Sequence, residues 1–557
     1  MRVFAFLCCA RAFRAPPPRG RPALRAAAEP RAAPEGWSTA AGPASTLIAG
    51  GGPCGLLTAL ALAERGWSGI RVVDRLAEPY DPADALLWSD AARFYLVGLG
   101  LRGQTALAAL GAWDAVERYC AAVVGRKDWA PGARADEGVE RVFTDRPVAT
   151  QVIARDRLQG ALYEACRAKH PERITFDWET EVDIVVTSAV EATLTRRDGS
   201  CEVLAPEFVA GCDGTARTVA MALEEVDRNV RVTRYRDDNK RVFKTVPLDL
   251  PAAWRGDINY STRSAGGRVN FDALPAAAVE EGKKRRYCGV LLLRSDDPLA
   301  AAGADLGELR ALVAASLPQF APFVDDQSLA AIARKPASRL PGFRFVGPRV
   351  HRGDGVVLLG DAIHTVKPYF GLGANSALED VTALQACLDA HATGARALGA
   401  FSRARAPEAR ALVQISRGFD RPGARGFLTF ILPIILDSVF HAALPRVFGP
   451  NTIASLQRRD TFVRVRWNKR RDRALQVAAL GGGLYLACSI VRAAARRALA
   501  TPAARRASLA ITAALALVGV AAILSAFFEA GLAPADVLTK TNSSPVASSS
   551  NEGFVTK

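Results

Sequence analysis

The sequence predicts an α/β fold in which an open, largely parallel sheet is interrupted by an inserted antiparallel sheet and followed by apolar helices. Three observations predict it. Short apolar strands end in a glycine-rich turn at 50–55 and in aspartate-bearing turns at 211–214 and 360–361. Strand-like runs between 226 and 345 alternate with glycine- and charge-rich loops, and apolar runs gather near the C-terminus. Ligands of open α/β sheets bind beyond the carboxyl ends of the strands, so the three turns form the expected binding region.

The length and composition indicate a multidomain chain with a membrane-linked end. With 557 residues there is room for two or three domains. The hydrophobic fraction is 50% and the formal net charge is +16, with arginine concentrated near the N-terminus and around the apolar C-terminal segments. No basic stripe is interleaved with aromatic residues, so we attribute the charge to targeting and membrane flanking, and expect no nucleic-acid partner.

The metal-binding residue types are dispersed. The ten cysteines show neither a CxxC nor a paired metal-ligand spacing, and the five histidines are scattered. This distribution predicts reduced, mostly buried thiols without a disulfide framework. We therefore expect no metal site.

Residues 1–37 are predicted to be a targeting presequence. A short apolar run, Val3 to Cys9, precedes an arginine-, proline- and alanine-rich stretch whose first acidic residue is Glu29. Acid-poor, arginine-rich N-termini are typical of targeting segments. The two-part pattern, with Phe13 after Ala-x-Ala, resembles the plastid presequences of algae with complex plastids. A mitochondrial presequence and a disordered extension are the alternatives.

The first core strand, Thr46 to Ala49, leads into a glycine motif. Gly50, Gly52 and Gly55 have the spacing GxGxxG at the start of an amphipathic helix, and a second strand at 70–73 ends in Asp74. The glycines allow a tight turn, the approach of a pyrophosphate and close helix–strand packing, while Asp74 can accept both hydroxyls of an adenosine ribose. The unit predicts a Rossmann-like dinucleotide site and does not distinguish FAD from NAD.

Two arginines and a second acidic turn follow along the chain. Arg93 comes after the first βαβ unit and Arg155 starts an amphipathic helix, so each can pair with phosphate; for Arg93 a solvated role is the alternative. A further strand, 208–212, ends at Asp213 and Gly214. This strand brings a second carboxylate to the expected binding edge.

The third acidic turn is Gly360-Asp361, after the apolar run 356–359. It continues through a proline- and glycine-containing loop, 367–375, into a helical pattern from Ser376 to Leu384. The loop glycines let backbone N–H groups approach a flat ligand, and the helix dipole stabilises negative charge there. A reduced flavin, anionic at its pyrimidine edge, is such a ligand.

Together these motifs resemble the class A FAD-dependent aromatic monooxygenases, whose FAD domain is of the glutathione-reductase type. Within that group the likeness is strongest to the kynurenine 3-monooxygenases, through 93–103, 209–214, 358–362, 368–371 and 401–403. It covers most of the chain from about residue 46 and assigns no side chain as a catalytic acid or base. The FAD-binding residues that it implies are Gly50, Gly52, Gly55, Asp74, Arg93, Arg155, Asp213, Gly214, Gly360, Asp361, Pro368, Gly371, Gly373, Ala374 and Asn375.

The resemblance also implies a place for the substrate. The family holds the substrate carboxylate with an arginine and a tyrosine, for which Arg126 and Phe143 are the best matches. Phe143 has no hydroxyl, and Leu372 stands between the flavin-loop glycines where the family has glutamine. Each lost polar contact weakens the binding of a polar substrate by about 1–3 kcal/mol. We therefore expect kynurenine or a related, more apolar aromatic compound.

The predicted domain order follows from these assignments. The FAD-binding domain takes 44–225 and 340–400, an antiparallel substrate sheet that covers the flavin takes 226–339, and helices take 401–473. His364, in the third turn, is interpreted as a packed or hydrogen-bonded residue rather than a base, because nothing nearby requires one.

Residues 474–530 are predicted to be the membrane segment. Ala507 to Phe528 is apolar and long enough to cross a hydrocarbon layer of about 30 Å. Ala474 to Val491 is apolar apart from Gln476 and three glycines, so it either completes a hairpin or is a buried core helix. Arginines flank both of its ends, so the positive-inside rule leaves the topology open. We expect an organelle membrane, plastid or alternatively mitochondrial, and a disordered tail at 531–557.

The resemblance implies a single-component hydroxylation. NADPH reduces bound FAD transiently, O2 adds at the flavin C4a, and the resulting hydroperoxide transfers one oxygen atom to an aromatic ring. The protein positions the reactants and keeps water from the intermediate. The alternatives are an FAD-dependent epoxidase or reductase of an apolar isoprenoid or quinone, and a flavoprotein-fold carrier without turnover. The intact Gly360-Asp361 disfavours the carrier, which has no need of ribityl contacts.

Overall fold

The computed structural model describes residues 37–498, apart from 85–94, 145, 188, 238, 278–282 and 422. The predicted presequence up to residue 36, Arg93, the apolar segment 507–528 and the tail at 531–557 lie outside the described residues.

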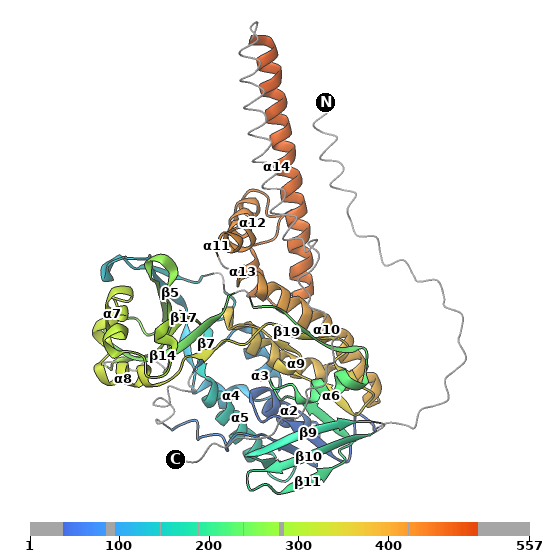
Figure 1. Cartoon of the computed structure of the whole chain (residues 1–557). Helices are drawn as coiled ribbons and strands as arrows, with labels where there is room; N and C mark the ends of the chain where they lie inside the picture. The colour runs from blue at the N-terminus through green and yellow to red at the C-terminus, as the bar shows by residue number, and fades with distance from the viewer. Residues whose placement is uncertain are drawn as a thin grey trace, which may run out of the picture. The chain divides into compact units, whose positions relative to one another are not determined.

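A six-stranded sheet in the order β20-β21-β12-β1-β2-β8 forms the centre of one half of the fold, which we call the parallel-sheet half (Figure 1). Five of its strands are parallel, and β20 pairs antiparallel with β21. β1, β12 and β21 are buried at every position, which explains why they are nearly continuous apolar runs. The strands are β1 (Thr46–Ala49), β2 (Ile70–Val73), β8 (Ile174–Asp177), β12 (Phe208–Gly211), β20 (His351–Arg352) and β21 (Val356–Leu358).

Helices and small sheets surround this parallel sheet. α2 (Pro53–Glu64) contacts both α5 (Arg155–Lys169) and α9 (Leu372–Ala390), and α9 contacts α3 (Leu101–Ala109) and α10 (Gly394–Gly418). Three three-stranded sheets complete this part, with α4 (Trp113–Glu117) and α6 (Thr218–Val226). Their strands are β3 (Leu96–Leu99), β7 (Thr150–Ala154) and β4 (Ala121–Val123); β9 (Thr180–Val186), β10 (Val190–Arg196) and β11 (Cys201–Leu204); β13 (Val230–Arg234), β19 (Arg344–Pro348) and β22 (His364–Thr365).

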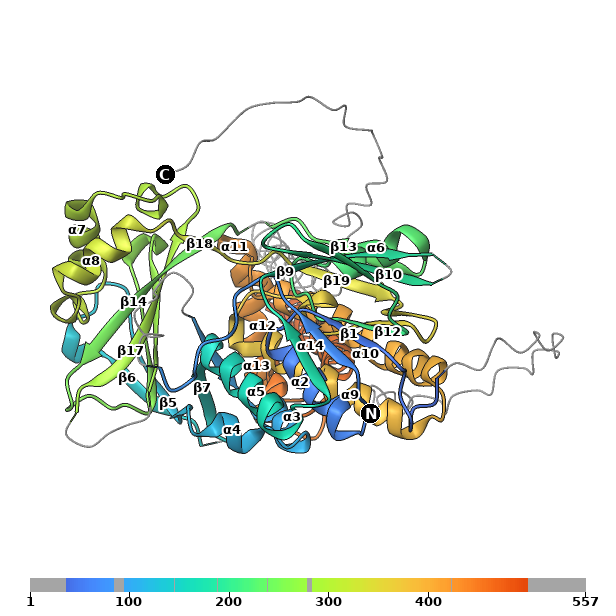
Figure 2. The same ribbon diagram turned by 90° about the horizontal axis from the view of Figure 1, so that it is seen from below.

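A seven-stranded sheet in the order β18-β14-β17-β16-β15-β5-β6 forms the centre of the other half of the fold. One of its faces packs against α7 (Leu306–Ser316) and α8 (Asp326–Arg334), around a separate core that includes Phe271, Tyr287 and Phe320 (Figure 2). β5 and β6 come from the segment that the sequence analysis assigned to the FAD-binding domain, so the chain enters this sheet twice. The strands are β5 (Gly125–Trp129), β6 (Val139–Val142), β14 (Arg241–Leu250), β15 (Ile258–Arg263), β16 (Asn270–Pro275), β17 (Arg285–Arg294) and β18 (Ser338–Arg339).

The other face of this sheet, which we call the inner face, turns toward the parallel-sheet half. Side chains alternate between faces along a strand, so the neighbours of the core residues on β14, β16 and β17 belong to it. Among them, Cys288 is buried against Ala154 of β7, with Leu96 of β3 packed beside it. The inner face therefore meets the parallel-sheet half at β3 and β7.

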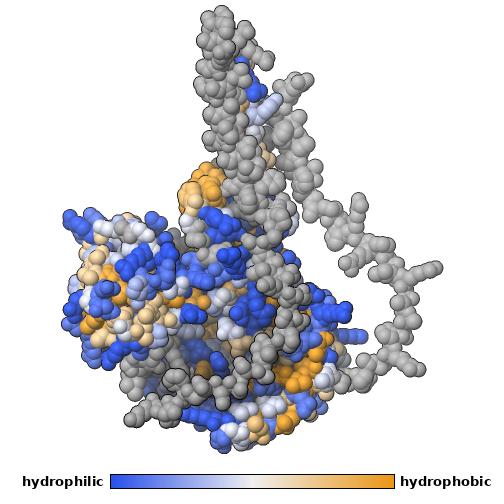
Figure 3. All heavy atoms as spheres, in the orientation of Figure 1, coloured by the Kyte–Doolittle hydropathy of each residue, from blue (hydrophilic) through white to orange (hydrophobic). Residues whose placement is uncertain are grey.

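The C-terminal helices expose many apolar side chains. They are α11 (Gly423–Gly426), a π-helical turn (Phe427–Ile431), α12 (Leu432–Ala443), α13 (Thr452–Leu456) and α14 (Phe462–Ala498). Val439 on α12 is 59% exposed and Tyr485 on α14 is 75% exposed. Figure 3 shows hydrophobic residues gathered over α11 and α12.

Two stretches of the described chain, Gly423–Ala443 and Phe462–Ala493, are long and apolar enough to cross a membrane by length and composition. The second contains the predicted segment 474–491, and the most apolar window of each is only 11% buried. Within the described residues, segment 474–491 is therefore not a buried core helix. The first stretch was not predicted, because Pro433, Asp437 and His441 interrupt its apolar run.

Candidate cofactor site

The predicted acidic turns lie side by side at one edge of the parallel sheet. β2, β1, β12 and β21 are consecutive neighbours, and their carboxyl ends lead to Asp74, Gly50, Asp213 and Asp361 in that order. Neighbouring strands are spaced by about 4.8 Å, so the three carboxylates share one edge. The structure thus brings together turns that are far apart in the sequence.

The glycine motif is shaped by close backbone contacts. Gly50 has a φ of +106°, and a Cβ at Gly55 would lie 1.9 Å from the Gly50 oxygen, so neither position tolerates a side chain. The Asp74 carboxylate accepts hydrogen bonds from the backbone N–H of Gly51 (2.7 Å) and of Leu76 (2.8 Å). Asp74 therefore orders the turn and keeps lone pairs for a further donor.

The N-terminus of α2 is open toward Arg155. No side chain caps the helix at Gly52, and a Cβ there would meet only the Arg155 Nη2, at 3.8 Å. Arg155 donates to Asp156 (2.9 Å) and Gln159 (2.8 Å), and Gln159 donates to the Gly51 oxygen (2.7 Å). A bare helix N-terminus beside a fixed guanidinium suits a phosphate group.

Tyr95 belongs to the same electrostatic group, although the sequence analysis passed over it. Burial raises the pKa of its hydroxyl, the Arg155 charge opposes this rise and the Asp361 charge adds to it. For Arg155, burial lowers the pKa, but the charges of Tyr95, Asp156 and Asp74 outweigh burial and leave it raised. Tyr95, Arg155 and Asp361 therefore lie within electrostatic range of one another. In the sequence, the one feature that could have pointed to Tyr95 is its position just before the strand β3.

Asp213 and Asp361 carry unused acceptor capacity. Asp213 Oδ2 accepts from the Val219 N–H (3.1 Å), whereas its Oδ1 is buried without a hydrogen-bond partner. The Asp361 carboxylate accepts no hydrogen bond in the described part of the chain; only its backbone oxygen does, from Arg217 (2.5 Å) and Thr365 (3.1 Å). Burial raises the pKa of both carboxyl groups. The buried Asp213 oxygen requires a donor and the half-buried Asp361 carboxylate can accept one, and the hydroxyls of a ribityl chain or ribose are such donors.

Behind the third turn lies a buried charge cluster that the sequence analysis missed. Asp380 of α9 accepts from the Gly360 N–H (2.9 Å), from Arg405 Nε of α10 (2.6 Å) and, at 3.0 Å, pairs with His364 Nε2. Burial raises the pKa of Asp380, but the Arg405 and His364 charges outweigh it, so the carboxyl remains ionised with a lowered pKa. His364 is also 3.3 Å from the Ser376 hydroxyl and is buried, as its interpretation as a packed residue requires. Asp380 thus fixes the backbone that presents Asp361.

The loop 367–375 is held from both sides. Asn375 donates to the Gly98 (2.8 Å) and Gly371 (2.7 Å) oxygens, and its Oδ1 accepts from the N–H groups of Gly100 and Gly103. All four bonds go to backbone, so the Asn375 side chain positions the loop. Gly371 has a φ of +65° and leaves the N-terminus of α9 without a side-chain cap. Leu372 is buried at the start of that helix.

On the opposite side of this loop, Lys367 is fully buried between two carboxylates. It donates to Asp237 (2.8 Å), Asp420 (2.7 Å) and the Asn239 oxygen (2.7 Å). Tyr369 donates to the other oxygen of Asp420 (2.5 Å). These contacts tie the loop to the end of α10 and to the segment before β14.

The two residues matched to a substrate carboxylate lie elsewhere, on the seven-stranded sheet. Arg126 is on β5 and donates from Nε to Asp128 (2.8 Å), and Phe143 follows β6 with the Arg146 guanidinium 3.5 Å from its ring centre. In the described part of the chain, no three metal-ligating side chains gather into a possible metal site.

A family model described as an FAD binding domain matches residues 43–416. The chain belongs to this family. Kynurenine 3-monooxygenase of Salinispora arenicola (strain CNS-205) is 27% identical over 378 residues, which cover 66% of this chain and 78% of that protein. Kynurenine 3-monooxygenase of Salinispora tropica is 25% identical over 476 residues, covering 81% and 96%. The expectation of an FAD-dependent monooxygenase that resembles the kynurenine 3-monooxygenases is confirmed.

Two solved structures share the fold of this chain. The tetrameric form of 2-methyl-3-hydroxypyridine-5-carboxylic acid oxygenase has a TM-score of 0.52 at 19% identity, covering 69% of this chain and 95% of that one. Anhydrotetracycline hydroxylase from Streptomyces rimosus has a TM-score of 0.50 at 20% identity, covering 74% and 75%. The fold is that of the flavin hydroxylases, and the open α2 N-terminus with the unpaired Asp213 and Asp361 oxygens fits FAD.

Proposed function

We propose that this flavin monooxygenase hydroxylates an aromatic substrate at the expense of NAD(P)H. The observation that supports it is the row of three carboxylate turns along four adjacent strand ends. Bound FAD would supply the activation of O2. In the overall balance, an aromatic C–H becomes C–OH with one oxygen atom of O2; the other atom leaves as water, which takes the hydride of NAD(P)H and one proton, and NAD(P)+ is released.

The chain's own residues would bind and orient the cofactor. The α2 N-terminus and Arg155 would hold the pyrophosphate, Asp74 the adenosine ribose, and Asp361 with Asp213 the hydroxyl-bearing chain. The 371–375 backbone and the α9 dipole would stabilise negative charge on the flavin ring. Arg93, Gly214, Gly360, Pro368, Gly373 and Ala374 would complete the contacts.

Kynurenine or a related, more apolar aromatic compound is the proposed substrate, with Arg126, Phe143 and Leu372 as the contacts to test. A second candidate is an epoxidase or reductase of an apolar isoprenoid or quinone. The exposed apolar side chains of α12 and α14 favour that candidate, because an apolar substrate resides in lipid.

We also propose that the C-terminal helices hold the enzyme on an organelle membrane. The two apolar stretches and their arginine flanks support this location, and the acid-poor N-terminal segment supports a plastid or mitochondrion. Either membrane would place the FAD domain next to lipid-dissolved compounds.

The deciding experiment uses the full chain purified in detergent. We expect yellow protein with flavin absorbance, and NADPH oxidation that one member of an aromatic, isoprenoid and quinone panel stimulates with incorporation of one atom of 18O2. Asp361→Ala should lose most of the flavin, whereas Asp389→Ala, at a surface site of α9, should keep it. Colourless wild-type protein, or stimulated NADPH oxidation without 18O in any product, would rule the proposal out.

A further inference from the structure

The inner face of the seven-stranded sheet carries an apolar group of side chains centred on β17, bordered on β16 by Asn270 and Asp272. Phe243 of β14, Val290 and Leu292 of β17 and Leu274 of β16 all lie on it. The register pairs Leu274 with Cys288 and Phe243 with Leu292, whereas Val290 faces Asp272 and Leu292 faces Asn270 on β16. The apolar group therefore runs along β17 and extends onto β14 and β16 at one position each.

Two contacts place this apolar area beside the candidate cofactor site. At one end Cys288 packs against Ala154 and Leu96, the residues next to Arg155 and Tyr95. At the other end Lys367 of the flavin loop binds the Asn239 oxygen (2.7 Å), two residues before β14. A compound held between the loop and the sheet would therefore lie against apolar side chains.

The arginine matched to a substrate carboxylate is already paired with an acidic side chain. Arg126 lies on β5, three strands from Cys288 on β17, which is roughly 14 Å at the usual strand spacing. Both Nε and Nη2 of Arg126 donate to Asp128, two residues along the same face. An incoming carboxylate would meet the Asp128 charge as well as the guanidinium, so the pair offers little net attraction.

Asn259 of β15 pairs with Arg126 of β5 in the register, so its side chain also lies on the inner face. Its Oδ1 is buried and has no hydrogen-bond partner. A ligand that reaches it must bring a donor, such as an amino or hydroxyl group, because an acceptor would leave the Asn259 oxygen unpaired.

Apolar contacts also lead from the flavin loop to the exposed helices. Phe370 of the loop packs on Phe419 (ring centres 5.4 Å apart), and Phe419 packs on Phe430 of the π-helical turn (5.0 Å). Phe427 and Ile431, in the same turn, are exposed. The loop is thus continuous with a surface that suits lipid-dissolved molecules.

We propose that the substrate is an uncharged aromatic compound that carries an amino or hydroxyl donor and no carboxylate. The inference rests on the proposed monooxygenase function and narrows its substrate class. It predicts that the amino-acid end of kynurenine is a hindrance here, and that the aminobenzoyl ring alone binds better.

The test compares kynurenine with 2-aminoacetophenone, which keeps the aminobenzoyl ring and lacks the amino-acid end. Substrate-stimulated NADPH oxidation and 18O incorporation are measured on the full chain in detergent, after flavin content is verified. We expect a KM for 2-aminoacetophenone at least tenfold below that for kynurenine. Equal or tighter use of kynurenine would overturn the proposal, while absence of flavin would instead refute the function on which it rests.

Two variants test the reason for this preference. Asp128→Asn removes the charge at nearly constant shape and frees the Arg126 guanidinium, so the KM for kynurenine should fall about tenfold with little change for 2-aminoacetophenone. Asp128→Ala should act in the same direction, which guards against a folding defect in either variant. Asp136→Ala, an exposed acid of the same segment paired with Arg134, is the matched control and should change neither KM. No gain for kynurenine in either Asp128 variant would contradict the inference.

Discussion

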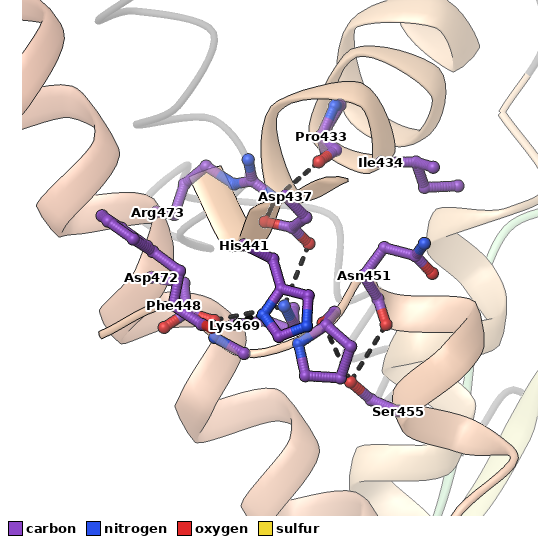
Figure 4. A network of polar contacts seen from close by, with 12 residues as sticks. Pro433, Ile434, Asp437, His441, Phe448, Asn451, Ser455, Lys469, Asp472 and Arg473 are labelled. Carbon is purple, nitrogen blue, oxygen red and sulfur yellow. Dashed lines mark hydrogen bonds and ion pairs between the residues drawn. The ribbon is translucent and has the colours of Figure 1, made fainter. Parts of the chain in front are cut away.

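Two of the buried charge clusters in this chain, centred on Asp380 and on Asp437, differ in what surrounds them. The Asp380 cluster lies inside the FAD-binding half, where Arg405, His364 and the Gly360 N–H surround one carboxylate. The Asp437 cluster lies between α12 and α14, where Lys469 (3.1 Å), Arg473 (3.2 Å) and Gln476 (3.0 Å) surround another (Figure 4). Asp472 joins the second cluster through Lys469 (3.2 Å).

The difference is in what each carboxylate positions. Asp380 binds a backbone N–H of the cofactor turn, so its loss reaches the ligand directly. Asp437 binds only side chains of a neighbouring helix in the described structure, so its loss loosens a helix pair. Equal burial therefore has unequal consequences for function, and four experiments test this contrast.

The largest effect is expected from Asp380→Ala. It removes the carboxylate partner of His364 and the acceptor of the Gly360 N–H, and it leaves Arg405 with Glu379 as its one carboxylate partner in the described structure, which costs about 3–5 kcal/mol of unfolding free energy. Thermal unfolding and bound-flavin absorbance should both fall sharply. The control is Asp389→Ala on the same helix, where the side chain is 68% exposed and little should change. If the variant kept wild-type flavin content, Asp380 would have no role in supporting the cofactor site.

Lys367→Met should have the next largest effect. It strands the Asp237 and Asp420 carboxylates beside the flavin loop, at a cost of about 2–3 kcal/mol. Because the loop rather than the strand edge is released, we expect weaker flavin binding with a measurable residual affinity. Flavin titration of the apoprotein gives the dissociation constant, and an unchanged value would show that the loop does not contact the cofactor.

Asp437→Ala should leave the cofactor site intact. The opening should be confined to α12 and α14, with less than about 1 kcal/mol lost by the FAD-binding half. Limited proteolysis between 423 and 460 should accelerate while flavin content stays at the wild-type level. Loss of flavin together with the proteolytic change would show that the two clusters unfold as one cooperative unit.

The smallest effect concerns His351, a half-buried titratable group of β20. Burial, followed by the charge of Arg349, lowers the pKa of His351 to about 4; the charge of Asp227 opposes this shift, and the charge of Arg403 adds to it slightly. The folded chain then binds fewer protons than the unfolded chain between pH 6.5 and 4, so this contribution to stability is lost as pH falls through that window. His351→Gln should flatten the dependence of Tm on pH there. An unchanged slope would show that other groups dominate.

The cofactor edge could be predicted from sequence because each part of it is local. Gly50 to Gly55, Asp213 with Gly214, and Gly360 with Asp361 each follow a short apolar strand, and their convergence follows from parallel pairing. Asp380 could not be predicted, because its partners lie 16 and 25 residues away on other elements. An acid on the buried face of a helix has no sequence signature until its arginine is placed.

The C-terminal helices show the same limit in a different setting. Segment 474–491 was found from its apolar run, whereas Gly423–Ala443 was missed because Asp437 breaks the hydropathy pattern. The residue that satisfies Asp437, Arg473, lies 36 positions further along the chain. Sequence alone also placed Arg126 as a carboxylate ligand without showing that Asp128 already occupies it.

The Asp437 cluster also bears on how this polypeptide is made. A lone helix carrying an aspartate near its middle enters a bilayer at a cost of roughly 2.5–3.5 kcal/mol, whereas α12 has its counter-charges on α14. Under the proposed membrane location, α12 would emerge first during synthesis and would find its counter-charges only once α14 follows. Delivery to the membrane would then be a late, paired event, and a chain truncated before Phe462 would remain in the aqueous phase.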